Sequence, residues 1–197
     1  MDISIEEKKK EFIDIYNKYI KRDGAKELLD FLIKSDFFTA PASTQFHSAY
    51  SGGLLVHSLN VFHRFENALR NEYGNNFEDK ISMESVAICG LLHDVCKIDI
   101  YKVDFKNKKV DGKWEQVPYY TTEDSLPYGH GEKSVYIISG YMKLSRMEAM
   151  IINWHMGGFD ARVKGGSYSI SEAYYRFPSA VIFHTCDMLA TYLDEEK

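Results

Sequence analysis

Cysteine is scarce in this chain of 197 residues, which contains three copies. Cys89, Cys96 and Cys186 are odd in number, and they lie in apolar stretches of helical character rather than in loops that a disulfide would staple. Small secreted proteins that depend on disulfides show the opposite pattern. We therefore expect no disulfide framework, and we expect the protein to occupy a reducing compartment.

Long hydrophobic runs are also lacking. No segment approaches the ~18 uncharged apolar residues that a membrane span needs, and the N-terminal string MDISIEEKKKEF contains no apolar signal segment. A soluble, cytoplasmic protein without membrane contact is expected. Hydrophobic residues nevertheless make up 45% of the chain, which is enough for one sizeable core. With no internal repeats or linkers, this composition predicts a single domain over residues 1–197.

An excess of basic residues is absent as well. The chain has 24 Lys and Arg against 29 Asp and Glu, a formal net charge of -5. This balance argues against broad, non-specific affinity for nucleic acid, which usually requires a basic face. It leaves room for a nuclease with a local basic channel, because carboxylates that bind a cation also count toward the negative total.

Hydrophobic periodicity predicts that most of the chain is helical. Apolar residues recur at helical intervals, and Ser4 with Glu7 and Ser145 with Glu148 have the spacing of a capping box. Gly24 is expected to end the first helix. The expected helices cover residues 4–21, 25–34, 54–71, a segment that starts near 82 and carries the dyad at 93–94, and then 132–143, 145–155 and 178–193.

One segment departs from the helical pattern. Between residues 98 and 127 apolar residues alternate with polar ones, and Asp111 and Gly112 supply a turn. Alternation around such a pair is typical of an antiparallel hairpin. The predicted fold class is therefore all-α, with a small inserted β-hairpin around residues 100–120.

The pair His93–Asp94 is the first candidate for chemistry, with Lys97 beside it. On an α-helix Lys97 would fall between the two side chains, so an imidazole, a carboxylate and an ammonium could reach one point. The alternative is an ordinary helix C-terminus, where His and Lys suit the dipole but Asp is unfavourable. A carboxylate that costs stability in an apolar helix favours a metal ligand.

Asp187 repeats this anomaly in the apolar string AVIFHTCDMLATYL. A buried carboxylate is costly unless it is paired or binds a cation, so Asp187 is either a metal ligand or the partner of a base such as Lys97. His57, His130 and His155 lie near predicted helix ends, where each alone is more often a capping or core residue. Together these residues predict a site for one or two divalent ions, with Mn, Fe, Ni, Co, Mg and Zn all possible.

The order His57, His93–Asp94, His130, His155 and Asp187 resembles the pattern H…HD…H…H…D of the HD superfamily of metal-dependent phosphohydrolases. The strings FHSAYSGGLLVHSLNV and LLHDVCKIDI are similar to members with nucleotidase or exonuclease activity, which tend to carry a lysine at the position of Lys97. The Gly-Tyr-Pro string of the diguanylate-hydrolysing branch is absent, since Met142 follows Gly140 and Tyr141.

The resemblance implies an HD-type helical bundle, with N-terminal helices over residues 4–35 and a metal-site core over 46–193. It also implies that His57, the dyad and Asp187 hold one metal, that His130 and His155 allow a second, and that Asp94 bridges the two. Asp94 and Lys97 are the predicted catalytic residues.

Other side chains are candidates for contact with substrate or for support of the ligands. His47, Arg64, Arg162 and Lys164 are predicted to bind substrate, the last two from a loop at residues 157–166. For each of them a plain loop position or a surface salt bridge is an alternative. His184 is one turn before Asp187 and is expected to orient a ligand, whereas His63 lies off the face of His57 and is expected to be structural.

The leading functional hypothesis is hydrolysis of a phosphate ester of a nucleotide or a related small substrate. A close alternative is a 3′-5′ exonuclease on single-stranded nucleic acid, for which Tyr101, Lys106, Lys108, Lys109 and Trp114 of the hairpin could supply an aromatic, basic channel. A di-iron HD oxygenase and a non-catalytic nucleotide-binding module are the remaining alternatives.

Overall fold

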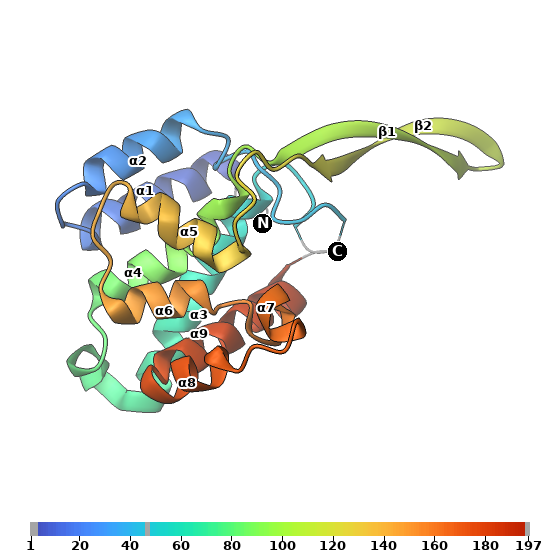
Figure 1. The fold of residues 1–197 in the computed structure, drawn as a ribbon. Helices are drawn as coiled ribbons and strands as arrows, with labels where there is room; N and C mark the ends of the chain where they lie inside the picture. The colour runs from blue at the N-terminus through green and yellow to red at the C-terminus, as the bar shows by residue number, and fades with distance from the viewer. Residues whose placement is uncertain (1–3, 46–47, 196–197) are drawn as a thin grey trace.

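The computed structural model describes residues 4–45 and 48–195, which form a mostly helical body with one projecting β-hairpin (Figure 1). In the described residues the α-helices are α1 (Ile5–Tyr19), α2 (Ala25–Lys34), α3 (Gly53–Tyr73), α4 (Met83–Leu92), α5 (His130–Ser139), α6 (Arg146–Asn153), α7 (Ala161–Lys164), α8 (Ser169–Arg176) and α9 (Ser179–Leu189). Strands β1 (Tyr101–Val110) and β2 (Lys113–Thr122) form the hairpin. Short 3-10 turns occupy Gly74–Asp79, Val95–Lys97 and Gly157–Phe159, and a π-helical turn, Ala190–Asp194, follows α9.

The N-terminal helices follow the sequence closely. Ser4 and Glu7 form the predicted capping box of α1, and α2 has the predicted bounds. Gly24 was expected to end α1, but that prediction is wrong: α1 ends at Tyr19, and Gly24 precedes α2 with φ +84°. Only glycine adopts this conformation readily, and a Cβ there would lie 1.8 Å from the carbonyl oxygen of Tyr141.

Helices α3, α4 and α9 form the centre of the body and carry much of its hydrophobic core. Helix α4 is buried on nearly every side, as its uniformly apolar sequence predicts. It packs closely on α3, since a Cβ on Gly90 would lie 2.6 Å from the Cα of Phe62. The C-terminal end of α4 therefore points into the interior, where the His-Asp dyad follows.

Several predicted helix ends are also wrong near the site described below. Helix α4 ends at Leu92, so His93 caps it and Asp94 leaves it with φ −106° and ψ 17°. Helix α5 begins at His130 and ends at Ser139, earlier than the expected 132–143, and α6 ends two residues before His155. Helices α7 and α8 were not predicted, because short, polar, glycine-flanked segments give weak periodic signals.

The hairpin has the predicted place and turn. Asp111 and Gly112 connect the strands with φ +47° and +85°, the left-handed pair that a tight two-residue hairpin turn requires. The strands pair with each other and extend away from the helices (Figure 1). Within residues 4–45 and 48–195, no helix has the length and apolar character to cross a membrane. All three cysteines are buried and free.

An ion pair between α6 and the segment after α1 ties the N-terminal helices to the core. Arg22 binds both carboxylate oxygens of Glu148 at 2.8 and 2.9 Å. The Glu148 side chain is almost fully buried, and it also accepts hydrogen bonds from Ser85 Oγ and the Ser145 amide, each at 2.7 Å. Glu148 thus serves the predicted capping box and the ion pair at once.

We expect Glu148→Ala to lower the free energy of unfolding by about 3 kcal/mol, because the variant leaves part of a buried ion-pair network without its counter-charge. Urea denaturation measures this change. The control is Asp30→Ala, which removes an exposed pair with Lys26 and should leave the free energy of unfolding nearly unchanged, because solvent screens such a pair. Equal effects of the two substitutions would contradict the prediction.

Candidate metal centre

Six residues predicted as metal ligands come together where helix ends of the body meet. His57 lies in the first turns of α3, His93 and Asp94 follow α4, His130 begins α5, His155 follows α6, and Asp187 lies near the end of α9. Helix ends suit such a site, because a residue there can turn its side chain inward without crowding the next turn.

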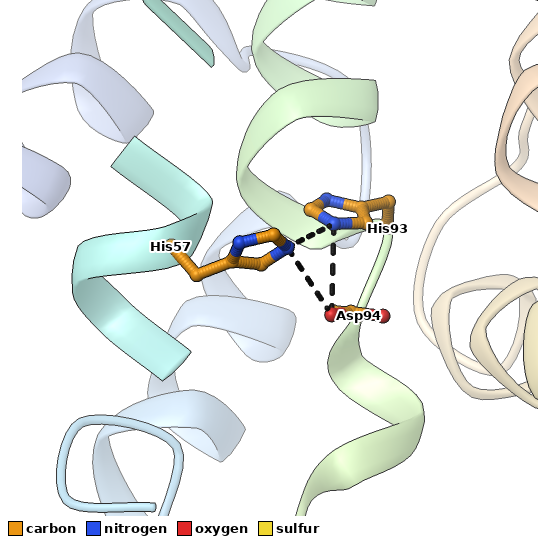
Figure 2. A group of neighbouring side chains, drawn as sticks. All are labelled: His57, His93 and Asp94. Carbon is orange, nitrogen blue, oxygen red and sulfur yellow. Dashed lines mark hydrogen bonds and ion pairs between the residues drawn. The ribbon is translucent and has the colours of Figure 1, made fainter. Parts of the chain in front are cut away.

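One group of donor atoms surrounds the Nε2 atom of His57. This atom lies 3.1 Å from His93 Nε2, 3.2 Å from Asp187 Oδ1 and 3.5 Å from Asp94 Oδ2. Figure 2 shows His57 and His93 turned toward each other above the Asp94 carboxylate. His57, His93 and Asp94 are all buried. Their donor atoms lie within 4.8 Å of one another, so these three side chains could hold a metal ion.

Asp94 joins this group to a second one. Its Oδ2 accepts from Lys97 Nζ at 2.7 Å and lies 3.6 Å from His93 Nε2. Its Oδ1 accepts from His130 Nε2 at 2.8 Å and lies 3.3 Å from His155 Nε2. The two oxygens of one carboxylate therefore face two different sets of imidazoles, as a bridging ligand would.

The outer nitrogens of three histidines are fixed by hydrogen bonds. His93 Nδ1 donates to the Gly90 carbonyl at 3.1 Å, and His155 Nδ1 donates to the Ile152 carbonyl at 2.6 Å. His57 Nδ1 donates to Glu195 Oε1 at 2.7 Å. Such bonds set the tautomer of a histidine that binds a metal, because the proton stays on the outer nitrogen and the deprotonated Nε2 can then offer its lone pair inward.

The structure itself indicates that this donor set fits a cation. In the described part of the chain, His155 Nε2 is buried and makes no hydrogen bond, although Asp94 is near. A buried polar atom without a partner is costly and calls for an explanation. Nitrogen and oxygen donors that converge on buried carboxylates match the chemistry of a divalent metal site.

The charges of the site follow from its burial and its close pairs. Burial alone would lower the pKa of His57, but hydrogen bonds to Asp187 and Glu195 outweigh it and raise the pKa to about 10. Burial would also lower the pKa of His130, but the nearby Cys96 sulfur and the hydrogen bond to Asp94 outweigh it and raise the pKa to about 10. Burial lowers the pKa of His93 to about 3.

The carboxylates remain charged despite their burial. Desolvation would raise the pKa of Asp94, but Lys97 and the neighbouring imidazoles hold it well below its usual value. The pKa of Asp187 is lowered in the same way, against its burial, by the hydrogen bond from His57. Burial opposes the charge of Lys97, and Asp94 more than restores it, so the Lys97 pKa is raised.

Metal binding should release protons and should strengthen as the pH rises. At pH 7 His57 and His130 are protonated in the protein alone, because their pKa values are about 10, and a metal ligand must be deprotonated. We expect release of about one proton for a metal at His57 and about two when a second binds at His130. Calorimetry in buffers of different ionisation enthalpy counts these protons, and affinity that is constant from pH 6 to pH 9 would contradict the prediction.

A cavity of about 800 Å³ opens above the donor atoms. Lys97, Asp94 and Asp187 line its polar floor, and Phe159, Met188 and Tyr192 supply apolar walls. The base of the hairpin also contributes, because Tyr101 and Thr122 line the same cavity. This space could admit a small molecule with one charged and one apolar end.

Comparison with protein-family models, with curated proteins and with solved structures finds no match. What this chain does must therefore be inferred from its own residues. The side chains that surround the cavity are the guide, since they decide which ligand the cavity would accept.

The residues predicted to bind substrate have different positions. Lys164 and His184 line the cavity, and His184 Nδ1 donates to the His155 carbonyl at 2.7 Å. Arg162 does not line it but binds Asp160 and stacks on Trp154. His47 lies outside the described residues.

Arg64 also lies away from the described lining of the cavity, and it pairs in a bidentate manner with Asp194. The salt-bridge alternative therefore describes Arg64 and Arg162 better than contact with a phosphate. His63 forms a half-exposed pair with Glu11 at 2.7 Å.

Two residues near the candidate metal ligands were not predicted. Cys96 Sγ lies 3.5 Å from His130 Nε2 and forms a possible metal-binding group with His130 and Asp94. Glu195 contacts His57 from 138 residues away. The dyad string HDVCK hinted at Cys96, but Glu195 lies in the charged string DEEK, which is typical of a solvated end.

Proposed function

We propose that this protein is an HD-type, metal-dependent phosphohydrolase that cleaves a phosphate ester of a nucleotide or a similar small molecule. The observation that carries the proposal is the convergence of four imidazoles, two carboxylates and the Lys97 ammonium at one cavity, which all of them line except the fully buried His93. The order of these residues along the chain is that of the HD superfamily.

Two metal positions are compatible with the side chains. His57, His93, Asp94 and Asp187 would hold one ion, and Asp94, His130 and His155 would hold a second. Bound metal ions lower the pKa of water and offset the charge of phosphoryl oxygens. Asp94 presents one oxygen to each group, which supports the bridging role that the resemblance implies.

The chain's own residues bind and orient the substrate. The Lys97 side chain is 12% exposed and lines the cavity, where its charge would stabilise phosphoryl oxygens as negative charge grows on them. Lys164 lines the same cavity and would hold a further phosphate oxygen. Phe159 and Tyr192 offer apolar faces against which a nucleobase would pack.

A panel of phosphate esters tests this proposal. Purified protein loaded with Mn²⁺, Ni²⁺, Co²⁺, Zn²⁺, Fe²⁺ or Mg²⁺ would be incubated with nucleoside mono-, di- and triphosphates and with a chromogenic phosphodiester, and phosphate or nucleoside release would be measured. We expect turnover with at least one metal and one nucleotide class. Tight metal binding without turnover of any ester would contradict the phosphohydrolase and favour a binding module or an oxygenase.

A second candidate function, cleavage of single-stranded nucleic acid from one end, is favoured by the hairpin. The strand register places Tyr101, Val103 and Phe105 on the same face as their partners Thr122, Tyr120 and Pro118, and Trp114 is on this face opposite Lys109. Val103 and Phe105 are each 59% exposed and Trp114 is 73% exposed. Because Tyr101 and Thr122 also line the cavity, this aromatic face leads directly away from the metal site.

The strand register also shows which of the three predicted lysines lie on the same face as these aromatic rings. Lys106 and Lys108 lie on the opposite face, with Tyr119 and Asp104, and only Lys109 of the three shares the face of Trp114. The hairpin as a whole carries five lysines and three acidic residues in a chain that is acidic overall. The bases of a single strand would thus stack on the aromatic face of the hairpin, and its phosphates would contact the hairpin lysines.

Trp114→Ala should weaken binding of a labelled single-stranded oligonucleotide about 5- to 150-fold, the equivalent of the ~1–3 kcal/mol that base stacking contributes. Fluorescence anisotropy measures binding, and hydrolysis of a chromogenic phosphodiester, too small to reach the hairpin, should stay unchanged. Tyr119→Ala, an aromatic loss on the opposite face, is the matched control. An equal effect of both variants, or no retention by the native protein, would remove this candidate and leave the nucleotide hydrolase.

A further inference from the structure

The segment that follows α9 turns back onto α3 through two consecutive acidic residues. Asp194 forms a bidentate ion pair with Arg64, and Glu195 binds His57. Arg64 and His57 are seven residues apart, about two helical turns, so they lie on one side of α3. We refer to Asp194 and Glu195 as the C-terminal clasp.

Glu195 is the buried member of the clasp. Its side chain is 0% exposed, although it belongs to a charged string. Oε1 accepts from His57 Nδ1 at 2.7 Å, and Oε2 accepts from Ser48 Oγ at 2.8 Å. Burial of a carboxylate is costly unless hydrogen bonds and an opposite charge offset the lost hydration. The bonds to His57 and Ser48 supply that compensation, so Glu195 is held in a specific position.

The Ser48 contact joins the clasp to the turn that begins α3. Ser48 is fully buried with φ +45°, an uncommon conformation for a residue with a side chain. Its carbonyl accepts from the Ala42 amide at 3.0 Å and leaves no room for a Cβ on Gly53, the first residue of α3. Glu195 therefore connects His57 to the turn that fixes where α3 starts.

Both nitrogens of the His57 ring contact carboxylates from the C-terminal end of the chain. Nε2 lies 3.2 Å from Asp187 Oδ1, inside the metal centre, and Nδ1 donates to Glu195 on the outer side. A carboxylate behind a metal-binding imidazole fixes the ring orientation, places the proton on the outer nitrogen and increases the basicity of the inner one. The Nδ1 atoms of His93 and His155 donate to backbone carbonyls instead. Among these three histidines, only His57 has a carboxylate as the acceptor for Nδ1.

We propose that Glu195 is a positioning residue for His57, and that the clasp makes metal affinity depend on docking of the C-terminal segment. This inference rests on the proposed metal centre, but not on which ester the protein cleaves. Asp194 contributes by anchoring the segment on Arg64, and Glu195 contributes by orienting the imidazole. The segment continues directly from α9, which supplies Asp187, and its own Tyr192 lines the cavity, so loss of docking would disturb both a candidate ligand and a wall of the cavity.

Titration with Co²⁺ tests the proposal without reference to activity. Glu195→Ala should lower Co²⁺ affinity about 10- to 100-fold, the range found when the outer partner of a ligand is removed. Glu195→Gln should retain most of the affinity, because its amide oxygen still accepts from His57 Nδ1. Glu172→Gln, an exposed acid on α8, is the matched control and should bind like the native protein.

Two further readouts separate positioning from a merely structural role. The visible spectrum of bound Co²⁺ should change in Glu195→Ala, and the ring ¹⁵N shifts of His57 in the Zn²⁺-loaded protein should show a loss of the fixed Nδ1–H tautomer. Should Glu195→Ala fail to fold, Glu195→Asp replaces it, since the shorter side chain withdraws the carboxylate but keeps the charge. It too should bind Co²⁺ more weakly.

Native affinity in the Ala and Asp variants would overturn the role of the clasp while leaving the metal centre and the phosphohydrolase intact. Equal losses in Glu195→Ala and Glu195→Gln, in proportion to their losses in thermal stability, would overturn positioning as well. Absence of Co²⁺ binding by the native protein would overturn the metal centre itself, and the clasp with it.

Discussion

Replacement of Asp94 by Ala is expected to abolish the metal centre and lower the rate of phosphate ester hydrolysis on the order of 10³-fold or more. The physical reason is that Asp94 contacts both groups of donor atoms, since Oδ1 faces His130 and His155 while Oδ2 faces His57, His93 and Lys97. A bound metal contributes several kcal/mol of transition-state stabilisation, and each ~1.4 kcal/mol is tenfold in rate.

Elemental analysis of the purified variant, beside the ester assay, measures both effects. Asp30→Ala on the exposed face of α2 is the matched control and should retain native metal content and rate. Circular dichroism would show that the variant keeps its helices. Native activity in a folded Asp94→Ala variant would contradict the phosphohydrolase proposal, and native metal content would contradict the bridging role of Asp94.

Lys97→Met is expected to have the second largest effect, a loss in kcat of about 10²- to 10³-fold with the metal retained. Lys97 Nζ contacts Asp94 rather than an imidazole, and it lines the cavity. Methionine keeps much of the side-chain length and apolar stem but removes the charge that would stabilise the phosphoryl oxygens. The metal ions themselves would still compensate the charge of Asp94.

Measuring both the metal content and the rate of the variant distinguishes two roles for Lys97. Full metal content with a reduced kcat and a nearly unchanged KM would support a role in the transition state. Loss of metal in parallel with rate would instead make Lys97 a structural partner of Asp94. Lys164→Met, which also changes the cavity lining, is a useful comparison, because loss of a substrate contact should raise KM more than it lowers kcat.

Local sequence signals predicted most of the helices and the hairpin because their physical causes are local. The capping boxes at Ser4 and Ser145 need a partner three residues away, and the Asp111–Gly112 turn needs the left-handed conformation of two adjacent residues. Helix ends at the candidate metal centre were predicted less well. Asp94 leaves the helix and still reaches Lys97, because the 3-10 turn at Val95–Lys97 carries the lysine back toward the carboxylate.

The residues of the candidate site also fall into those that the sequence predicted and those whose contacts it could not predict. Composition and residue order singled out the six donors, because imidazoles and carboxylates in apolar surroundings are costly wherever the chain takes them. Nothing in the neighbourhood of Arg64 distinguishes a phosphate contact from an ion pair, and its partner Asp194 is 130 residues away. Arg162 was likewise ambiguous until its stacking on Trp154 was visible.

The sequence by itself therefore determined that this protein is mostly helical, that it carries a hairpin, and which side chains are candidates for a metal. Only the tertiary structure decided that those side chains meet, that Asp94 lies between two groups of them, and that one face of the hairpin continues the cavity wall. It also revealed Cys96 beside His130 and Glu195 behind His57. The physical reason is that these arrangements depend on the packing of α3, α4, α5, α6 and α9 against one another, and contacts between residues so distant along the chain leave no periodic or local pattern in it.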